Sequence, residues 1–196
     1  MHEDTSHPVA RMTTGAGTRQ RILDAANELF YSQGIRATSA DRIIEQVGIT
    51  KVTFYRHFRT KSDLVVAYLE QQSAAERAWL ESTARGGDPL ARARTIAADI
   101  GAASCSPGFR GCAFINAAAE FADPEDPVRA AVAAHREWMT GVFAEVAAQA
   151  GVRDVAAVAN QLMMLRDGAM VSGYLGESTA VAGSLEAAFV SVLRSE

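Results

Sequence analysis

The amino-acid sequence predicts an all-α protein of about nine helices, with a three-helix helix-turn-helix unit at the N-terminus and a larger helical unit after it. Apolar residues recur every three or four positions through most of the chain, and no strand-like alternation competes with that pattern. Alanine makes up 38 of the 196 residues and proline only 5, a composition typical of closely packed helices. At about 150 residues per domain, the length fits one domain or two small ones.

The N-terminal unit is predicted from residues that start and stop helices. Residues 1–17 show no periodicity and are expected to form a mobile arm, which leaves residues 18–63 for the helix-turn-helix unit and 64–196 for the larger unit. Residues able to cap a helix precede each apolar run, and glycines stand where helices should end. The expected starts are Thr38 with Ser39, Thr50, and Thr60 with Asp63; the expected ends are Gly34 and Gly48.

The later helices follow from repeated start signals. Aspartate followed by proline, at Asp88 and again at Asp126, provides a cap and a residue suited to the first helical position. The glycines of residues 85–87 are expected to break the fourth helix, and residues 104–111 form an irregular stretch. The predicted helices of this region begin at Pro89 and then cover residues 112–121, 127–150, 154–175 and 179–194.

Charge is divided unevenly along the chain. The net charge is −4, but residues 18–61 carry +4 and residues 62–196 carry −7. The helix-turn-helix unit is therefore basic although the whole chain is acidic. A positive charge in this unit is what contact with the phosphates of a nucleic acid requires.

Several classes of protein are disfavoured by what the sequence lacks. No apolar run approaches the ~18 residues that a membrane span needs, and Cys105 and Cys112 are too few for a disulfide framework, so a cytoplasmic protein without a membrane partner is expected. No phosphate-binding glycine loop, nucleophile elbow or paired-histidine metal motif occurs, so neither catalysis nor a cofactor is indicated. A redox role for the two thiols stays open, although buried, inert thiols are the commoner outcome.

The predicted third helix carries side chains suited to DNA. Phe54 and Phe58 lie one turn apart and are expected to pack on the core of the unit, which leaves the other side chains outside or at its margin. Arginine can read guanine edges, threonine and valine can meet thymine methyl groups, and tyrosine and lysine can bond phosphate oxygens. The alternative is a solvated basic face that binds no DNA. The candidate contacts are Lys51, Val52, Thr53, Tyr55, Arg56 and His57, with Thr38 and Ser39 at the preceding helix start.

One segment of this unit resembles a known family. Residues 37–65 read ATSADRIIEQVGITKVTFYRHFRTKSDLV, and in helix order, turn length and the Phe-Tyr-x-His-Phe core of the third helix they resemble the DNA-binding domain of the TetR (tetracycline-repressor-like) family of bacterial regulators. The resemblance extends from about Thr18 to Leu69. It implies that the third helix approaches bases, that Lys61 binds phosphate, and that the second domain dimerises and senses a ligand. Val52 and Arg59 depart from the residues often found there, which leaves the operator sequence open.

The last two predicted helices carry apolar side chains on two faces each, more than a monomer is expected to bury. The resemblance implies that they pair with a second copy in a four-helix bundle. Small residues such as Gly173 and Ala182 would permit close approach of helices. The candidate interface residues are Leu162, Met163, Met170, Tyr174, Val181, Leu185 and Phe189.

A few polar groups among aromatic and methionine side chains indicate a small-molecule pocket in the larger unit. Plain core packing explains each of these residues about as well, and His135 equally fits a histidine bonded to a buried carbonyl or to Glu120. The candidate ligand contacts are Trp79, Phe114, Asn116, Glu120, His135, Trp138, Met139, Met163, Arg166 and Met170.

Together these features predict a homodimeric, ligand-responsive transcriptional regulator that binds a double-stranded DNA operator. A repressor released from a palindromic site by a small-molecule effector is the simplest form. The alternative is an all-helical small-molecule-binding protein or enzyme that kept the fold without specific DNA binding. Activation in place of repression also stays open, because nothing in the sequence separates the two.

Overall fold

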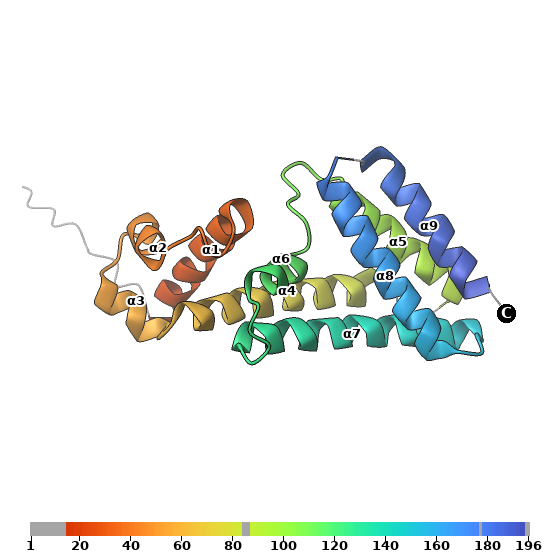
Figure 1. The fold of residues 1–196 in the computed structure, drawn as a ribbon, viewed down its shortest axis with the longest axis horizontal. Coiled ribbons are helices and arrows are strands. Elements are labelled where there is room, and N and C mark those ends of the chain that lie inside the picture. Colours follow the sequence, from red (N-terminus) through yellow and green to blue (C-terminus); the bar gives the residue numbers. More distant parts are fainter. Residues whose placement is uncertain (1–14, 84–86, 177, 195–196) are drawn as a thin grey trace, which may run out of the picture.

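The computed structural model describes residues 15–83, 87–176 and 178–194, and in those ranges the chain forms nine α-helices and no strand (Figure 1). The prediction of an all-helical protein is confirmed. The helices are α1 (Gly15–Gln33), α2 (Ala40–Val47), α3 (Lys51–His57), α4 (Lys61–Thr83), α5 (Pro89–Ser104), α6 (Ala113–Glu120), α7 (Pro127–Ala150), α8 (Val155–Tyr174) and α9 (Ser178–Arg194).

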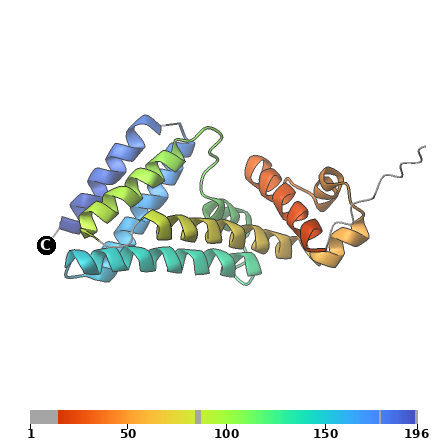
Figure 2. The same ribbon diagram turned by 180° about the vertical axis from the view of Figure 1, so that it is seen from behind.

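The helices form two groups that α4 joins. The first three make a small unit at one end, and α4 leaves that unit to run alongside α7 (Figures 1 and 2). At the other end α5, α8 and α9 pack together, while the short α6 packs on α4 and α7 between the two groups. A movement within the larger group can therefore reach the small unit through α4 or α6.

The helix boundaries follow from local capping chemistry. Thr50 Oγ1 accepts the Thr53 N–H at 3.2 Å, and Thr60 and Asp63 exchange two reciprocal hydrogen bonds of 3.0 Å. Gly48 ends α2 with φ +70°, a left-handed conformation that glycine adopts at little cost. Three residues then separate α2 from α3, the turn length that the sequence predicts.

Two boundaries differ from expectation or lie beyond what is described. Because α1 begins at Gly15, residues 15–17 are helical and do not belong to the expected arm. Residues 1–14 lie outside the described residues, as do residues 84–86, where the fourth helix is expected to break. Among the described helices, none has the length and apolar character needed to cross a membrane.

Close backbone contacts fix α5 against α8 and α9. A Cβ atom added to Gly101 of α5 would lie 2.6 Å from Ala182 Cα of α9, and one added to Gly173 of α8 would lie 2.5 Å from the Ser104 carbonyl oxygen of α5. The small residues expected to admit a second copy therefore admit helices of the same chain. This is why α5 covers one apolar face of each of the last two helices.

Candidate functional site

The apolar side of α3 anchors it to the small unit. Phe54 and Phe58 are buried with their ring centroids 6.3 Å apart, and Ile22, Ile43 and Val47 of α1 and α2 are buried with them. This is the core that the sequence predicts. Because Phe54 and Phe58 hold one side of α3 in this core, the opposite side of the helix faces solvent.

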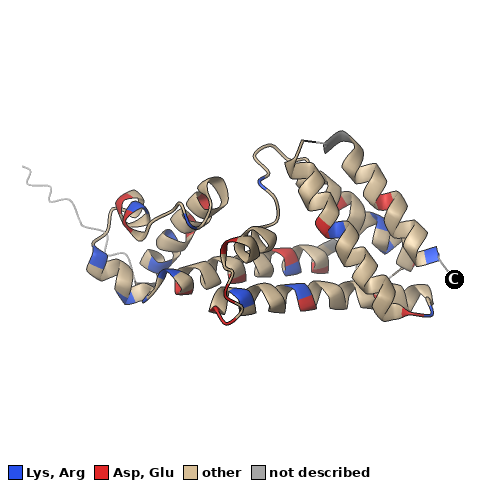
Figure 3. Ribbon diagram, viewed as in Figure 1, with Lys and Arg blue, Asp and Glu red and all other residues tan. Residues whose placement is uncertain are grey.

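The outer side of α3 is exposed, and two of its residues there, Lys51 and Arg56, are basic. Figure 3 marks the lysine and arginine positions along this helix. Val52 is 81% exposed and Tyr55 47% exposed. Arg56 is exposed as well, whereas His57 and Thr53 are half-buried at its margin. The exposed side chains include a guanidinium, a phenol and an aliphatic group, the kinds that contact bases and phosphates in DNA grooves.

Two lysines flank α3 in the sequence, and the charge of a carboxylate acts on each of them. Lys51 opens α3, and its Nζ lies 2.8 Å from Oδ1 of Asp41 on α2; the hydrogen bond to Asp41 and its charge raise the pKa of the Lys51 ammonium. Lys61 opens α4 and is half-buried. Burial lowers the pKa of Lys61, and the charge of Glu120 opposes that shift.

The expected phosphate contact through Thr38 does not fit the structure. Its side chain is fully buried, and its hydroxyl donates to the Gly34 carbonyl at 2.9 Å. Ser39 is exposed instead, and its Oγ accepts the Arg42 N–H at 3.2 Å as the cap of α2. Of this pair only Ser39 is placed where a phosphate could approach the helix start.

A cavity of about 320 Å³ lies among α4, α5, α7 and α8. Four of the expected ligand contacts line it: Trp79, Met139, Arg166 and Met170. The rest of the lining is Gln72, Ala75, Glu76, Asp99, Ile100 and Ala103. Of the polar residues in the lining, sequence reasoning found Arg166 but missed Gln72, Glu76 and Asp99. A signal was available, because Gln72, Glu76 and Trp79 are spaced to share one face of a helix.

Arg166 places a charge in the cavity wall, and its side chain is only 2% exposed. Nη1 lies 3.2 Å from Cys112 Sγ and 3.2 Å from Asp167 Oδ1, and Nη2 lies 3.6 Å from Glu76 Oε2. Burial disfavours the charge, but Cys112, Glu76 and Asp167 outweigh it and raise the pKa of the guanidinium. The group is therefore a permanent cation in contact with three partners.

His135 links the cavity wall to α6. Its ring stacks on Phe114 with centroids 3.5 Å apart, its Nδ1 lies 3.1 Å from Ser73 Oγ, and its Nε2 lies 3.3 Å from Glu76 Oε2. A structural role for the histidine fits these contacts, with Glu76 as its carboxylate and not Glu120. Four other expected ligand contacts do not line the cavity and lie in the core or against it: Phe114, His135, Trp138 and Met163.

The two other expected ligand contacts, Asn116 and Glu120, lie at the junction with the small unit. Asn116 Nδ2 donates to the Arg110 carbonyl at 2.9 Å. The Glu120 carboxylate accepts the Ile35 N–H at 3.0 Å and also the Arg36 N–H. Neither residue lines the cavity, because Asn116 is turned toward the loop before α6 and Glu120 toward the loop between α1 and α2.

Most of the expected interface residues are buried within one chain. Leu162, Met163, Met170 and Phe189 expose so little surface that a second copy could hardly bury them further. The sequence could not show this, because each helix has two apolar faces and only the position of α5 decides which of them is covered. The exposed apolar residues of α8 and its end are Met164, Val171, Tyr174 and Leu175.

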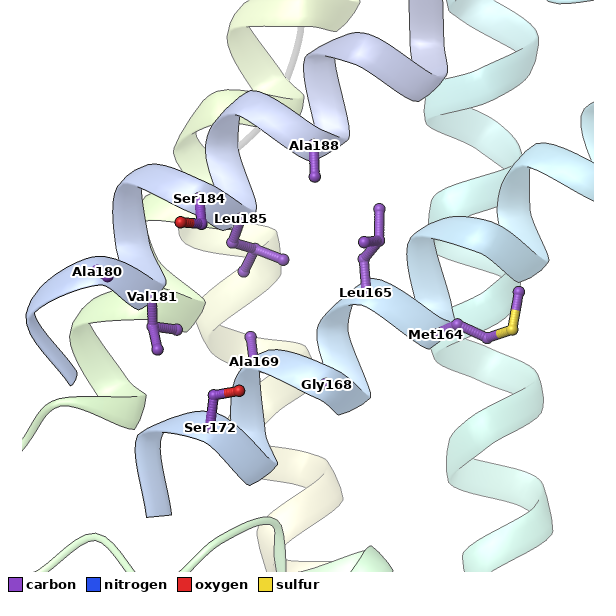
Figure 4. Close-up of a pocket in the computed structure, with 10 residues that line it drawn as sticks. All are labelled: Met164, Leu165, Gly168, Ala169, Ser172, Ala180, Val181, Ser184, Leu185 and Ala188. Atoms are coloured by element: carbon purple, nitrogen blue, oxygen red, sulfur yellow. The ribbon is translucent and has the colours of Figure 1, made fainter. Parts of the chain in front are cut away.

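A groove of about 390 Å³ separates α8 from α9 on the outer side (Figure 4). Val181 and Leu185 of the expected interface lie along it, facing Leu165 and Ala169 of α8. The lining is completed by Met164, Gly168, Ser172, Ala180, Ser184 and Ala188. The groove is thus mostly apolar and combines large aliphatic side chains with glycine, alanine and serine.

A small helix-turn-helix unit with an exposed basic helix, followed by a larger helical unit around a cavity, defines the class of helix-turn-helix transcriptional regulators. Residues 22–68 match the family model described as bacterial regulatory proteins, tetR family. The crystal structure of SCO4454, a TetR-family transcriptional regulator from Streptomyces coelicolor, is similar at 40% identity and a TM-score of 0.85, over 90% of this chain and 94% of that one. The chain belongs to the TetR family of transcriptional regulators, and not to a family of enzymes.

Curated relatives match a shorter stretch. YvkB of Bacillus subtilis, an uncharacterized HTH-type transcriptional regulator, is 41% identical over 66 residues, which are 34% of this chain and 35% of that protein. The HTH-type transcriptional regulator AcrR of Shigella flexneri is 42% identical over 81 residues, 40% of this chain and 38% of that protein. The chain thus matches little more than a third of the length of these relatives, and its effector must be argued from its own residues.

Proposed function

We propose that this protein is a homodimeric, ligand-responsive DNA-binding regulator, and specifically a cytoplasmic repressor that a small molecule releases from a palindromic operator. The observation that carries the proposal is the exposed side of α3, where Tyr55, Arg56 and Val52 project from a helix whose other side is locked into a core. A helix held in this way can enter the major groove without losing its fold. Lys51 and Lys61 would then reach phosphates at its two ends.

Dimerisation supplies the spacing that a palindrome needs. Two recognition helices must lie about 34–36 Å apart to read successive major grooves. The apolar outer face of α8 and α9 supports pairing in a four-helix bundle, with Met164, Val171 and Leu175 buried by the partner. In the proposed dimer interface, these exposed residues take the place of the predicted interface residues that are buried within one chain.

The response to a ligand would pass through α6. Its N-terminal cap, Cys112, contacts Arg166 of the cavity wall, and its last residue, Glu120, holds the backbone of the small unit. Tyr31 of α1 adds a second contact, since its hydroxyl accepts the Arg110 N–H at 2.9 Å. A ligand that favours a different position of α6 would therefore shift the small unit away from the operator spacing, in proportion to its differential affinity for the two states.

The experiment that tests the proposal selects bound sites from a random pool of double-stranded DNA with the purified protein. An enriched palindrome is expected. Tyr55→Ala and Lys61→Ala should each weaken binding to it by roughly tenfold, because each removes about one phosphate contact. Dimer mass, measured by light scattering, should not change.

Arg153→Ala is the matched control, since Arg153 is an exposed cation in the loop between α7 and α8, far from α3. It should leave operator affinity unchanged. If no palindrome is enriched, or if both α3-side variants bind like the parent protein, the chain is better described as a helical small-molecule-binding protein that makes no specific DNA contact.

A further inference from the structure

The cavity wall contains a buried hydrogen-bond donor with no acceptor in the described part of the chain. Arg166 lines the cavity and is 2% exposed, and its Nε–H has no hydrogen-bond partner among the described residues. The Nη2 atom beside it lies 3.6 Å from Glu76 Oε2, beyond hydrogen-bonding distance. Buried donors are almost always satisfied in folded proteins, so this donor of a cavity-lining residue is available to an acceptor that a ligand supplies.

The charges around that donor decide the charge of the ligand. Glu76 and Asp167 lie within 4 Å of the Arg166 guanidinium, and Arg136 pairs with Asp167 at 2.8 Å. These two cations and two carboxylates balance each other. Asp99, also in the lining, adds one further negative charge. The net charge around Arg166 is thus −1, which disfavours an anionic ligand. An ammonium group cannot accept the Nε–H and would lie against the like charge of the guanidinium, so a neutral acceptor fits this position.

The remaining lining is apolar and adaptable. Trp79 provides a flat aromatic surface, and Met139 and Met170 are flexible side chains that can repack around a ligand. The volume of about 320 Å³ is at the small end of the range for ligand cavities. A compact molecule with an apolar, ring-containing body fits this lining.

We propose that the effector is a small, neutral, mostly apolar molecule with one carbonyl-type oxygen that accepts a hydrogen bond from Arg166 Nε. This inference rests on the sensor role proposed above and names the chemical class that the sensor reads. The same hydrogen bond gives the ligand a direct connection to α6, because Arg166 also contacts Cys112 at the start of that helix.

The test compares four probes that share one bicyclic skeleton: the ketone α-tetralone, the hydrocarbon tetralin, and the corresponding carboxylate and primary amine. Binding to the full-length protein without DNA is measured by isothermal titration calorimetry. The ketone is expected to bind about tenfold more tightly than the hydrocarbon, the difference of one net hydrogen bond. The carboxylate and the ammonium should bind more weakly than the ketone.

Variants connect this ranking to the cavity. In Arg166→Lys the advantage of the ketone over the hydrocarbon should disappear, because lysine has no Nε–H in that position. Arg136→Lys is the matched control: Arg136 pairs with the same Asp167 but does not line the cavity, and the ranking should survive. Ala75 lines the cavity at an exposed position, so Ala75→Phe should narrow the cavity. The affinity for all four probes should then fall by at least about tenfold.

Equal binding of ketone and hydrocarbon, or tightest binding of the carboxylate or the amine, would overturn the proposed ligand class. The ranking is measured without DNA, so it stands apart from the operator experiment. A protein that ranks the probes as expected but enriches no palindrome contradicts only the proposed regulator. A protein that enriches a palindrome but ranks the probes otherwise contradicts only the ligand class.

Discussion

At the scale of single residues, Lys51 is a proposed DNA contact whose ammonium is already paired with a carboxylate of the same protein. Its ammonium is paired with Asp41 at 2.8 Å, and both side chains are about two-thirds exposed. An exposed ion pair contributes little to stability, so a DNA phosphate can compete for the lysine. Binding DNA nevertheless requires that this pair be broken and that the Asp41 charge be tolerated near the phosphates.

Asp41→Asn should therefore tighten DNA binding several-fold and steepen the dependence of log affinity on log salt by about 0.9, the value for one additional neutralised phosphate. The loss of the ion pair and of a carboxylate in the first turn of α2 should lower stability only slightly, because both side chains are exposed. Fluorescence anisotropy across a salt series measures the slope. Asp24→Asn, which removes an exposed carboxylate of α1, is the control; an equal gain there would show that net charge alone is responsible.

Individual site residues were predictable only where local chemistry decides their position. The exposed set on α3 follows from Phe54 and Phe58, whose spacing fixes which side is buried. Thr38 could not be placed in this way, because its hydroxyl is taken by a carbonyl in its own loop. The role of Glu120 could not be predicted from the sequence either. Its hydrogen-bond partner Ile35 lies 85 positions away, and only the folded chain brings the two residues together.

At the scale of helices, the sequence predicts where a helix begins and ends, but not which other helices it packs against. Thr50 and the pair Thr60 and Asp63 act through bonds within three residues, so their sequence pattern is sufficient. The packing of α5 against α8 and α9 joins segments some 70 to 80 residues apart, as at Gly173 and Ser104. The sequence shows that these helices carry small residues, but not which helix lies against them.

Gly173→Ala should destabilise the protein by about 1–3 kcal/mol, because the new methyl group would lie 2.5 Å from the Ser104 carbonyl oxygen and neither helix backbone can move freely. Gly141→Ala, in the middle of α7, brings the added carbon within 4 Å of no described residue beyond its own stretch of helix, and should stabilise by about 0.5–1 kcal/mol. Urea unfolding followed by circular dichroism gives both values. A stabilising Gly173→Ala would mean that α5 and α8 do not approach as closely as described.

At the scale of the whole molecule, α6 is placed to couple the two groups of helices. One end contacts the buried guanidinium of Arg166, and its other end supplies the carboxylate of Glu120 to two backbone N–H groups between α1 and α2. Phe114, in between, stacks on His135, which in turn lies beside Glu76 of the cavity. A change at the cavity wall therefore has a continuous path of contacts to the small unit, in addition to the path through α4.

Glu120→Gln tests that coupling because it changes one contact and leaves the shape intact. The carboxylate has an oxygen for each of the Ile35 and Arg36 N–H groups, whereas an amide offers one oxygen and would direct its NH₂ at the second donor. The junction should weaken by about 1–3 kcal/mol. Hydrogen exchange at the Ile35 and Arg36 amides should accelerate accordingly, and operator affinity should respond less to any effector.

The control is Glu125→Gln, which changes an exposed residue of the loop before α7 and should alter neither the exchange rates nor the response to an effector. If exchange at both amides stays at the parent rate in Glu120→Gln, the carboxylate does not hold the small unit, and coupling must run through α4 alone.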